Sequence, residues 1–230
     1  SFWAMTSLEA FGRQFADDLQ MLIRGTLGTK RAVRAVRYAD RVVVRPGSIK
    51  PVPVSLARDG RLAARLMFTY DITLDSSGIF PSVTNSKVRI DSPATNRPVL
   101  RYEFIKEANR SPTAHWHVHG ESTELGRILG GSPSVRTSLS NLHLPVGGSR
   151  FRPGLEDVIE LLITELRFDH ASQWRHNLHR GREAWRSTQL AVAVRDAPET
   201  AAEALRDLGY EVQRRSPGAG SRNRRRLTQW

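Results

Sequence analysis

The hydrophobic positions of the chain change their spacing twice, from a helical period to an alternating one and back. Over residues 7–24, apolar side chains recur with the spacing of one helix face, which predicts an amphipathic opening helix. Gly25 and Gly28 follow it, and either can end it. The apolar face of this helix comprises Leu8, Phe11, Phe15, Leu19, Leu22 and Ile23.

The middle of the chain alternates between apolar and polar residues. From Arg61 to Asp75 every second residue is apolar, the pattern of a half-buried strand. Residues 29–45 favour one strand that stops before a Pro-Gly pair. We expect further strands at 79–90, 98–105 and 114–119. The short connections between them predict an antiparallel meander, because parallel strands need longer crossovers.

Helical spacing returns in the last third. Pro153 suits the first position of a helix that runs to Leu166, and the carboxylates of Glu156 and Asp157 lie in its first turn, where they complement the helix dipole. Tyr210–Val212 is a candidate for a last short strand. The other expected helices are Ser122–Leu129, Ser172–Arg195 (as one helix or two) and Pro198–Leu208.

These patterns predict an α+β fold: a curved antiparallel sheet of about five to seven strands between residues 30 and 146, covered by the opening helix and the Pro153 helix. We interpret residues 1–4 as a tag scar before Met5 and residues 5–168 as the core domain. Residues 169–213 form a basic helical region and 214–230 an arginine-rich flexible tail.

The composition of the chain excludes several kinds of functional site. The chain has 230 residues and no cysteine, which excludes disulfides, thiol nucleophiles and thiolate metal sites. No apolar run approaches the roughly 18 to 20 residues of a membrane-spanning helix. We therefore expect a cytoplasmic protein with no membrane partner.

The net charge of +12 favours a polyanionic partner, RNA more than DNA. The helical region near residues 174–186 interleaves tryptophans with arginines, a combination that can stack bases and neutralise phosphates. The alternative is that the tryptophans belong to the core and the arginines to its solvated face. The candidate nucleic-acid contacts are Arg175, Arg180, Arg182, Arg186, Arg224, Arg225 and Arg226.

All seven histidines lie between His115 and His179. His115, His117 and His119 occupy alternate positions, so on a strand they project from one face, with Trp116 and Val118 directed toward the core. Two such imidazoles can hold one zinc or iron ion if a third ligand arrives from elsewhere, and His143 and Glu121 are the candidates for it.

The same histidines can instead perform metal-free acid–base catalysis on a phosphodiester, with His143 as a fourth member of the site. They can also be simply the polar face of a strand. The sequence leaves these three alternatives open.

A glycine-rich loop precedes the Pro153 helix. Its backbone amides and the positive end of the helix dipole favour an anion, and two arginines flank it. The expected phosphate-binding residues are Gly147, Gly148, Arg150 and Arg152. The alternative is a tight loop that needs glycine only for its shape.

Four segments occur in a suggestive order: Leu100–Phe104, His115–His119, Leu142–Pro145 and Leu155–Ile159. This layout, over residues 60–166, resembles the small bacterial toxins of the TumE type, in which an R-Y-like strand and a histidine segment precede an apolar helix opened by L-E-D. The histidines here are spaced H-x-H-x-H instead of H-H-x-H. The resemblance implies a cytoplasmic toxin–antitoxin component that acts on RNA and is silenced by a protein partner.

The sequence therefore predicts a bacterial toxin-like ribonuclease with His115, His117, His119 and His143 in its site and an acidic protein such as an antitoxin as partner. Two alternatives stay open: a non-enzymatic nucleic-acid-binding or adaptor protein, and a small-molecule enzyme with a metal on His115, His117 and His143. The compact size also allows a homodimer.

Overall fold

A computed structural model of the chain describes residues 2–75, 78, 80–109, 111–122, 137–138, 144–146 and 151–213. Its helices are α1 (Phe2–Leu27), α3 (Leu155–Thr164), α4 (Trp174–Asp196) and α5 (Pro198–Asp207). Its longer strands are β1 (Val33–Arg37), β2 (Val42–Pro46), β3 (Val54–Arg58), β4 (Arg61–Leu74), β5 (Pro81–Asp91), β6 (Pro98–Ile105) and β7 (Ala114–Val118). Three two-residue strands are β8 (Glu121–Ser122), β9 (Thr137–Ser138) and β10 (Leu144–Pro145).

One antiparallel sheet dominates the fold. Its strands follow the order β1-β2-β4-β5-β6-β7-β10, and β3 pairs with β4 beside this path. β8 and β9 form a separate pair. The α+β class, the antiparallel meander and the helical C-terminal region are thus confirmed. None of the described helices combines the length and the apolar character needed to cross a membrane.

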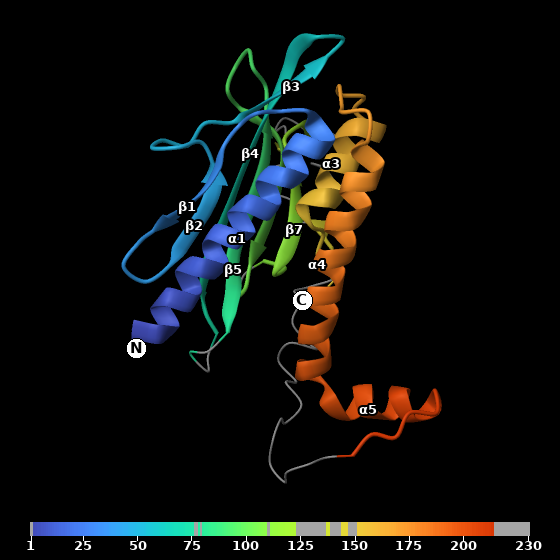
Figure 1. Cartoon of the computed structure of the whole chain (residues 1–230). Helices are drawn as coiled ribbons and strands as arrows, with labels where there is room; N and C mark the ends of the chain where they lie inside the picture. The colour runs from blue at the N-terminus through green and yellow to red at the C-terminus, as the bar shows by residue number, and fades with distance from the viewer. Residues whose placement is uncertain are drawn as a thin grey trace.

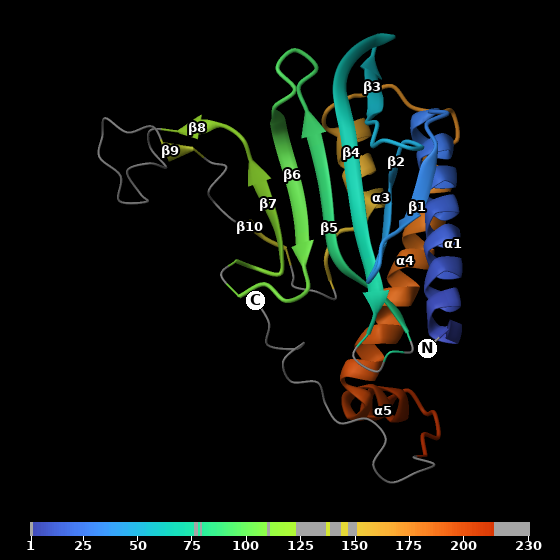
Figure 2. The same ribbon diagram turned by 90° about the vertical axis from the view of Figure 1, so that its left-hand side faces the viewer.

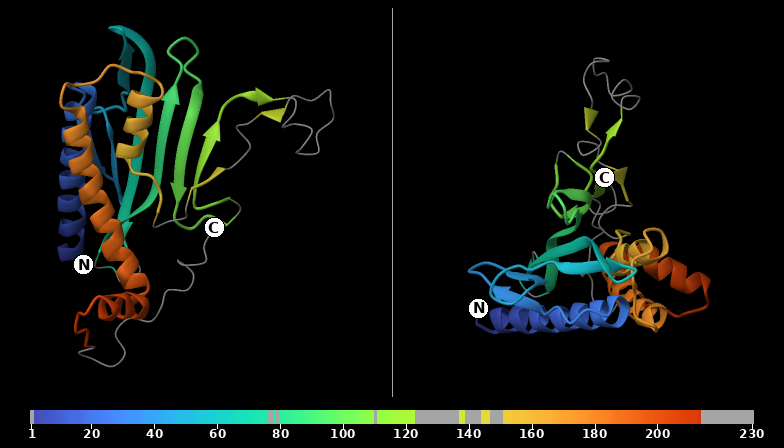
Figure 3. Two further views of the ribbon diagram at one scale, coloured as in Figure 1. Left: turned by 90° about the vertical axis from the view of Figure 1, so that its right-hand side faces the viewer. Right: turned by 90° about the horizontal axis from the view of Figure 1, so that it is seen from above.

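The helices lie on one face of the sheet. Figure 1 and the left panel of Figure 3 show α1, α3 and α4 packed along this face, and Figure 2 views the opposite face, which no helix covers. The core lies between the two layers, because the buried side chains of β4 face Leu19, Leu22 and Ile23 of α1 and the apolar face of α3. Phe68, in the middle of β4, is fully buried.

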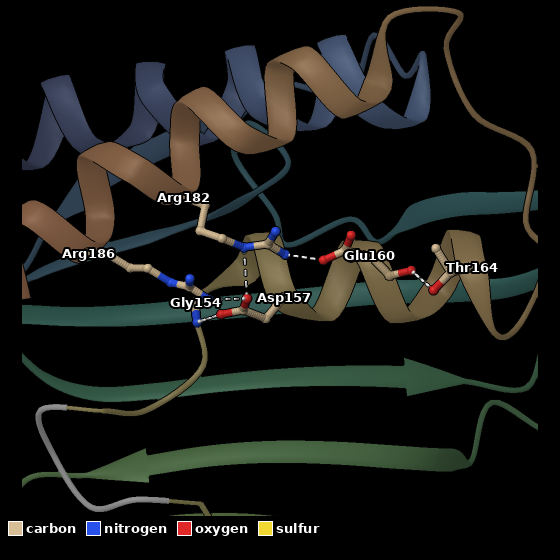
Figure 4. Close-up of polar contacts among 6 residues, drawn as sticks. All are labelled: Gly154, Asp157, Glu160, Thr164, Arg182 and Arg186. Atoms are coloured by element: carbon tan, nitrogen blue, oxygen red, sulfur yellow. Dashed lines mark hydrogen bonds and ion pairs between the residues drawn. The ribbon is translucent and has the colours of Figure 1, made fainter.

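Ion pairs join α3 to α4. The guanidinium of Arg182 on α4 contacts the carboxylates of Asp157 and Glu160 on α3, and Arg186 lies 3.4 Å from the same Asp157 oxygen (Figure 4). Asp157 also accepts a hydrogen bond from the backbone N–H of Gly154 at 2.9 Å. The first turn of α3 is therefore capped and tied to α4 by one carboxylate.

Residues 29–45 contain two strands instead of the single strand that their composition suggested. β1 and β2 form a hairpin closed by a hydrogen bond from the N–H of Tyr38 to the carbonyl of Arg41. The guanidinium of Arg37 also binds two carbonyls of the turn. The turn has no glycine, proline or asparagine, so the usual sequence signal for a hairpin was missing.

Element ends also differ from expectation. α1 runs from Phe2 to Leu27, three residues beyond the predicted end, and Gly28 at φ +66° follows it. Pro153 is not the first residue of α3, since the hydrogen bond from Gly154 to Asp157 sets the cap at Gly154. Tyr210–Val212 forms no strand. Of the helix expected at Ser122–Leu129, Ser122 belongs to β8 and the remainder lies outside the described residues.

Candidate metal centre

The β6–β7 hairpin brings together a carboxylate and two histidines. The register sets Glu103 opposite His115 and Arg101 opposite His117. Between them, Tyr102 and Trp116 point to the core face, where their rings pack 5.3 Å apart. The histidines therefore lie on the face that carries no helix, as their alternation predicted.

Three ligand atoms converge at this place. The Nε2 of His117 lies 3.2 Å from Oε2 of Glu103, and the Nε2 of His115 lies 3.7 Å from the same oxygen. One ligand atom from each residue lies within 4.8 Å of the others. Both imidazoles are buried, with exposed fractions of 1% for His115 and 4% for His117.

A backbone carbonyl fixes the orientation of His115. Its Nδ1 is 2.7 Å from the carbonyl oxygen of Pro112, in the loop before β7. A carbonyl only accepts, so Nδ1 carries the proton and the lone pair of the neutral ring is at Nε2, facing Glu103. Two lone pairs in such proximity repel unless a proton or a metal cation lies between them. A hydrogen bond from the second ring nitrogen to a carbonyl is also the usual support of a metal-bound histidine.

Two cations, one on the same strand and one on the neighbouring strand β5, keep Glu103 ionised. The Nζ of Lys87 contacts Oε1 at 2.9 Å, and the Nε of Arg101 lies 3.3 Å from Oε2. Burial alone would raise the pKa of Glu103. In the metal-free protein, a proton between His115 and Glu103 completes a hydrogen bond to the carboxylate. This bond, the hydrogen bond from Lys87 and the positive charges of Lys87 and Arg101 outweigh the effect of burial and lower the pKa to about 2.

A cavity of about 380 Å³ opens along β4, β5 and β6 next to this cluster. Glu103 and Lys87 form part of its wall, and the polar side chains of Thr69, Asp71 and Asn85 continue it. Lys87 is half-exposed and so reaches solvent from the same wall. The buried cluster therefore has a polar, accessible neighbour that a small molecule can enter.

The donor set suits a divalent transition metal. Two imidazoles and one carboxylate are a known ligand combination for zinc and for non-haem iron. Ligands on one such ion, at about 2.0–2.2 Å from it, lie roughly 3.0–3.6 Å from one another. The observed separations of 3.2 and 3.7 Å from Glu103 fall near this range. The three ligand atoms together lie within 4.8 Å of one another, so the two imidazoles must approach each other when one ion binds.

Glu103 is the candidate metal ligand that sequence reasoning missed. His143, expected as the third ligand, and the side chain of Glu121 lie outside the described residues. His119 follows β7, and its backbone N–H donates to the carbonyl of Val99 at 2.9 Å. It does not belong to the group of three. Its imidazole pKa is lowered by burial and by the charge of Arg101, although Asp91 and Glu103 oppose this.

Arg152, expected to bind phosphate, lies inside the protein. Its guanidinium carbon is 3.9 Å from the ring centroid of Phe104 and 5.0 Å from that of Trp185, and 8% of the residue is exposed. Cation–π packing between the sheet and α4 is therefore what the structure shows for this arginine. The other expected phosphate-binding residues, Gly147, Gly148 and Arg150, lie outside the described residues.

The arginines of α4 fall into two groups. Arg182 is half-buried between two carboxylates of α3, so its charge is already compensated, and Arg186 shares one of them (Figure 4). Arg175 and Arg180 are exposed, and Arg175 stacks over the ring of Trp174, which is buried as a core residue. Arg224, Arg225 and Arg226 lie outside the described residues.

Comparison with protein-family models, with curated proteins and with solved structures found no match to this chain.

Proposed function

We propose that the chain binds one divalent transition metal, zinc or iron, through His115, His117 and Glu103, and that this centre serves a metal-dependent enzyme acting on a small polar molecule. The observation that carries the proposal is the convergence of two Nε2 atoms on one carboxylate oxygen. The cavity beside Glu103 supports the size and polarity of the substrate.

Each residue has a defined task in this proposal. The carbonyl of Pro112 holds His115 with its Nε2 lone pair toward the site. Lys87 binds Oε1 of Glu103, whereas Oε2 faces the two histidines and the guanidinium of Arg101. Lys87 and Asn85 then offer donors to an oxygen-rich substrate in the cavity. The metal, when bound, supplies Lewis acidity.

Burial favours this role over acid–base catalysis on RNA. A polymer phosphodiester must touch the catalytic imidazoles, whereas His115 and His117 are almost completely buried. A metal ion and a small molecule need far less space. The ribonuclease function, the toxin resemblance and the antitoxin partner remain predictions of the sequence, as do the cytoplasmic location and the homodimer.

Elemental analysis of the purified protein tests the proposal. We expect close to one zinc or iron ion per chain in the wild type and a loss of most of it in His117→Ala. His176→Ala, which removes an exposed histidine on α4, is the matched control and should keep its metal. Equal metal contents in all three proteins, or none in the wild type after addition of either metal, would contradict the proposal.

A substitution of Arg101 should change metal binding in the opposite direction. Its guanidinium competes with a metal for Oε2 of Glu103, so Arg101→Gln should bind zinc more tightly than the wild type. The reason is that it removes a positive charge from the neighbourhood of the ion. Weaker zinc binding in a folded Arg101→Gln would contradict the position assigned to the metal.

Nucleic-acid binding is a second candidate, favoured by the exposure of Arg175 and Arg180 on α4 and by the net charge of +12. Reversing both charges to Glu should weaken binding to single-stranded RNA and reduce its salt dependence, without changing the metal content. Unchanged RNA affinity in the double variant would exclude α4 as the contact surface.

A further inference from the structure

A second cavity, of about 510 Å³, lies between α1 and α4 on the helical side of the molecule. Figure 1 and the left panel of Figure 3 show the two helices side by side, and the amide of Asn177 on α4 donates to the carbonyl of Gly25 on α1 at 3.1 Å. The wall is mostly apolar and aromatic, with Phe15, Leu19 and Leu22 from α1 and Trp185 from α4. This is the composition of a small-molecule pocket.

A buried carboxylate lines this cavity. Glu156, the second residue of α3, has 7% of its surface exposed and lines both this cavity and a smaller one of about 30 Å³. It belongs to the α3 layer, whereas the metal centre lies on the other face of the sheet. The site is therefore separate from the proposed metal centre.

Two glycines make room for the carboxylate. A Cβ at Gly154 would lie 2.5 Å from Oε2 of Glu156, and a Cβ at Gly181 would lie 2.9 Å from Oε1. The same missing Cβ of Gly154 leaves space for the indole of Trp185, whose Nε1 is 3.2 Å from that position. An aromatic ring and a carboxylate thus lie close together in the wall of the cavity.

The nearby arginines do not pair with Glu156. Arg182 and Arg186 contact Asp157 and Glu160. Arg180, which also lines the cavity, donates to Asn177, and Arg152 lies over the rings of Phe104 and Trp185. No ion pair to Glu156 occurs within the described ranges. Burial raises its pKa, with a smaller contribution from Asp157, although a hydrogen bond from its own backbone N–H and the charges of Arg182 and Arg186 act in the opposite direction. A buried carboxylate without a cationic partner is costly, and a ligand that supplies the cation would remove this cost.

We propose that the cavity between α1 and α4 binds an organic cation with an apolar body, an ammonium compound whose charged head pairs with Glu156. The head also meets the face of Trp185, a contact that favours quaternary and methylated ammonium groups. The apolar body lies on Phe15 and Leu19. This site is independent of the metal centre.

Benzyltrimethylammonium is a suitable probe, and neopentylbenzene is its neutral isostere. The readout is the indole N–H resonance of Trp185 in a nitrogen-15 spectrum, assigned with Trp185→Phe. We expect a saturable shift with the cation and a dissociation constant at least tenfold larger in Glu156→Gln, because a charge-assisted contact is lost. Glu165→Gln, an exposed carboxylate at the end of α3, is the matched control and should bind like the wild type.

Three outcomes would overturn the proposal. One is the absence of any saturable shift in the wild type. Another is equal affinity of the cation for the wild type and for Glu156→Gln. The third, which needs no variant, is equal affinity of the wild type for the cation and for neopentylbenzene. Metal content should be the same in Glu156→Gln and in the wild type, so a failure here leaves the metal centre untouched.

Discussion

Replacing Glu103 by Gln should destabilise the metal-free protein in a pH-dependent way. The Glu103 carboxylate contacts Lys87 at 2.9 Å, Arg101 at 3.3 Å and the two buried histidines. These surroundings lower its pKa from the ordinary value of 4.5 to about 2. At 1.36 kcal/mol for each tenfold change in acidity, this difference amounts to at most about 3 kcal/mol. Some of the side chain stays in contact with solvent, so we expect about 1–3 kcal/mol at pH 7.

The direction of the pH dependence follows from the lowered pKa. The folded state binds the proton of Glu103 less tightly than the unfolded state, so the stabilisation is complete above about pH 5 and declines as the pH falls toward 2. At pH 3 less than about half of it should remain. The difference in stability between the wild type and Glu103→Gln should shrink accordingly.

Urea denaturation in the presence of a chelator, at pH 7 and at pH 3, measures this difference. Glu203→Gln, an exposed carboxylate on α5, serves as the control and should match the wild type at both pH values. A Glu103→Gln protein as stable as the wild type at pH 7 would contradict the stabilising role assigned to the Glu103 carboxylate. So would a difference that stays constant between pH 7 and pH 3.

Three further substitutions probe the fold by the same denaturation assay. Arg182→Met removes the contacts with Asp157 and Glu160 and should lower the free energy of unfolding by about 1–3 kcal/mol. A decrease of less than about 0.5 kcal/mol would show that these ion pairs do not stabilise the fold. Phe68→Ala leaves a cavity at the centre of β4 and should cost about 3–5 kcal/mol; a smaller loss would mean that the core collapses around it. Gly47→Ala should destabilise by more than about 1 kcal/mol, because φ is +104° and the new Cβ would lie 2.2 Å from the Lys50 carbonyl oxygen, and a neutral effect would contradict this turn geometry.

Much of the sheet could be predicted because its patterns are local. Every second residue of β4 from Leu62 to Leu74 is apolar, and the side chains from Ala64 to Ile72 in this series are buried, so the extent of the strand and most of its buried face follow from the sequence. β6 was expected at its exact bounds, Pro98–Ile105, for a similar reason. The β1–β2 hairpin was missed because its turn, near Asp40, lacks the residues that usually mark one.

The site was only half predictable. The alternation of His115 and His117 placed them on one face of a strand. Their partner, Glu103, comes from another strand, and the pattern of one strand does not show how it is aligned with its neighbour. A usable signal did exist: a hairpin whose turn is centred near residue 109 sets Glu103 opposite His115. A carboxylate facing a histidine across a predicted hairpin is therefore worth testing in other sequences.

The environment of Arg152 could not be predicted from the residues next to it in the sequence. It precedes the helix α3, so its position suggested a phosphate contact. Its actual neighbours, the rings of Phe104 and Trp185, come from β6 and α4 and are distant in the sequence. Only tertiary packing decides whether such an arginine is buried.

The most direct test of the proposed metal centre is anomalous diffraction at the zinc or iron absorption edge from crystals grown with that metal. We expect one strong peak about 2.0–2.2 Å from Nε2 of His115, Nε2 of His117 and Oε2 of Glu103. No peak at these atoms, or a peak only at other histidines such as His170 or His179, would contradict it.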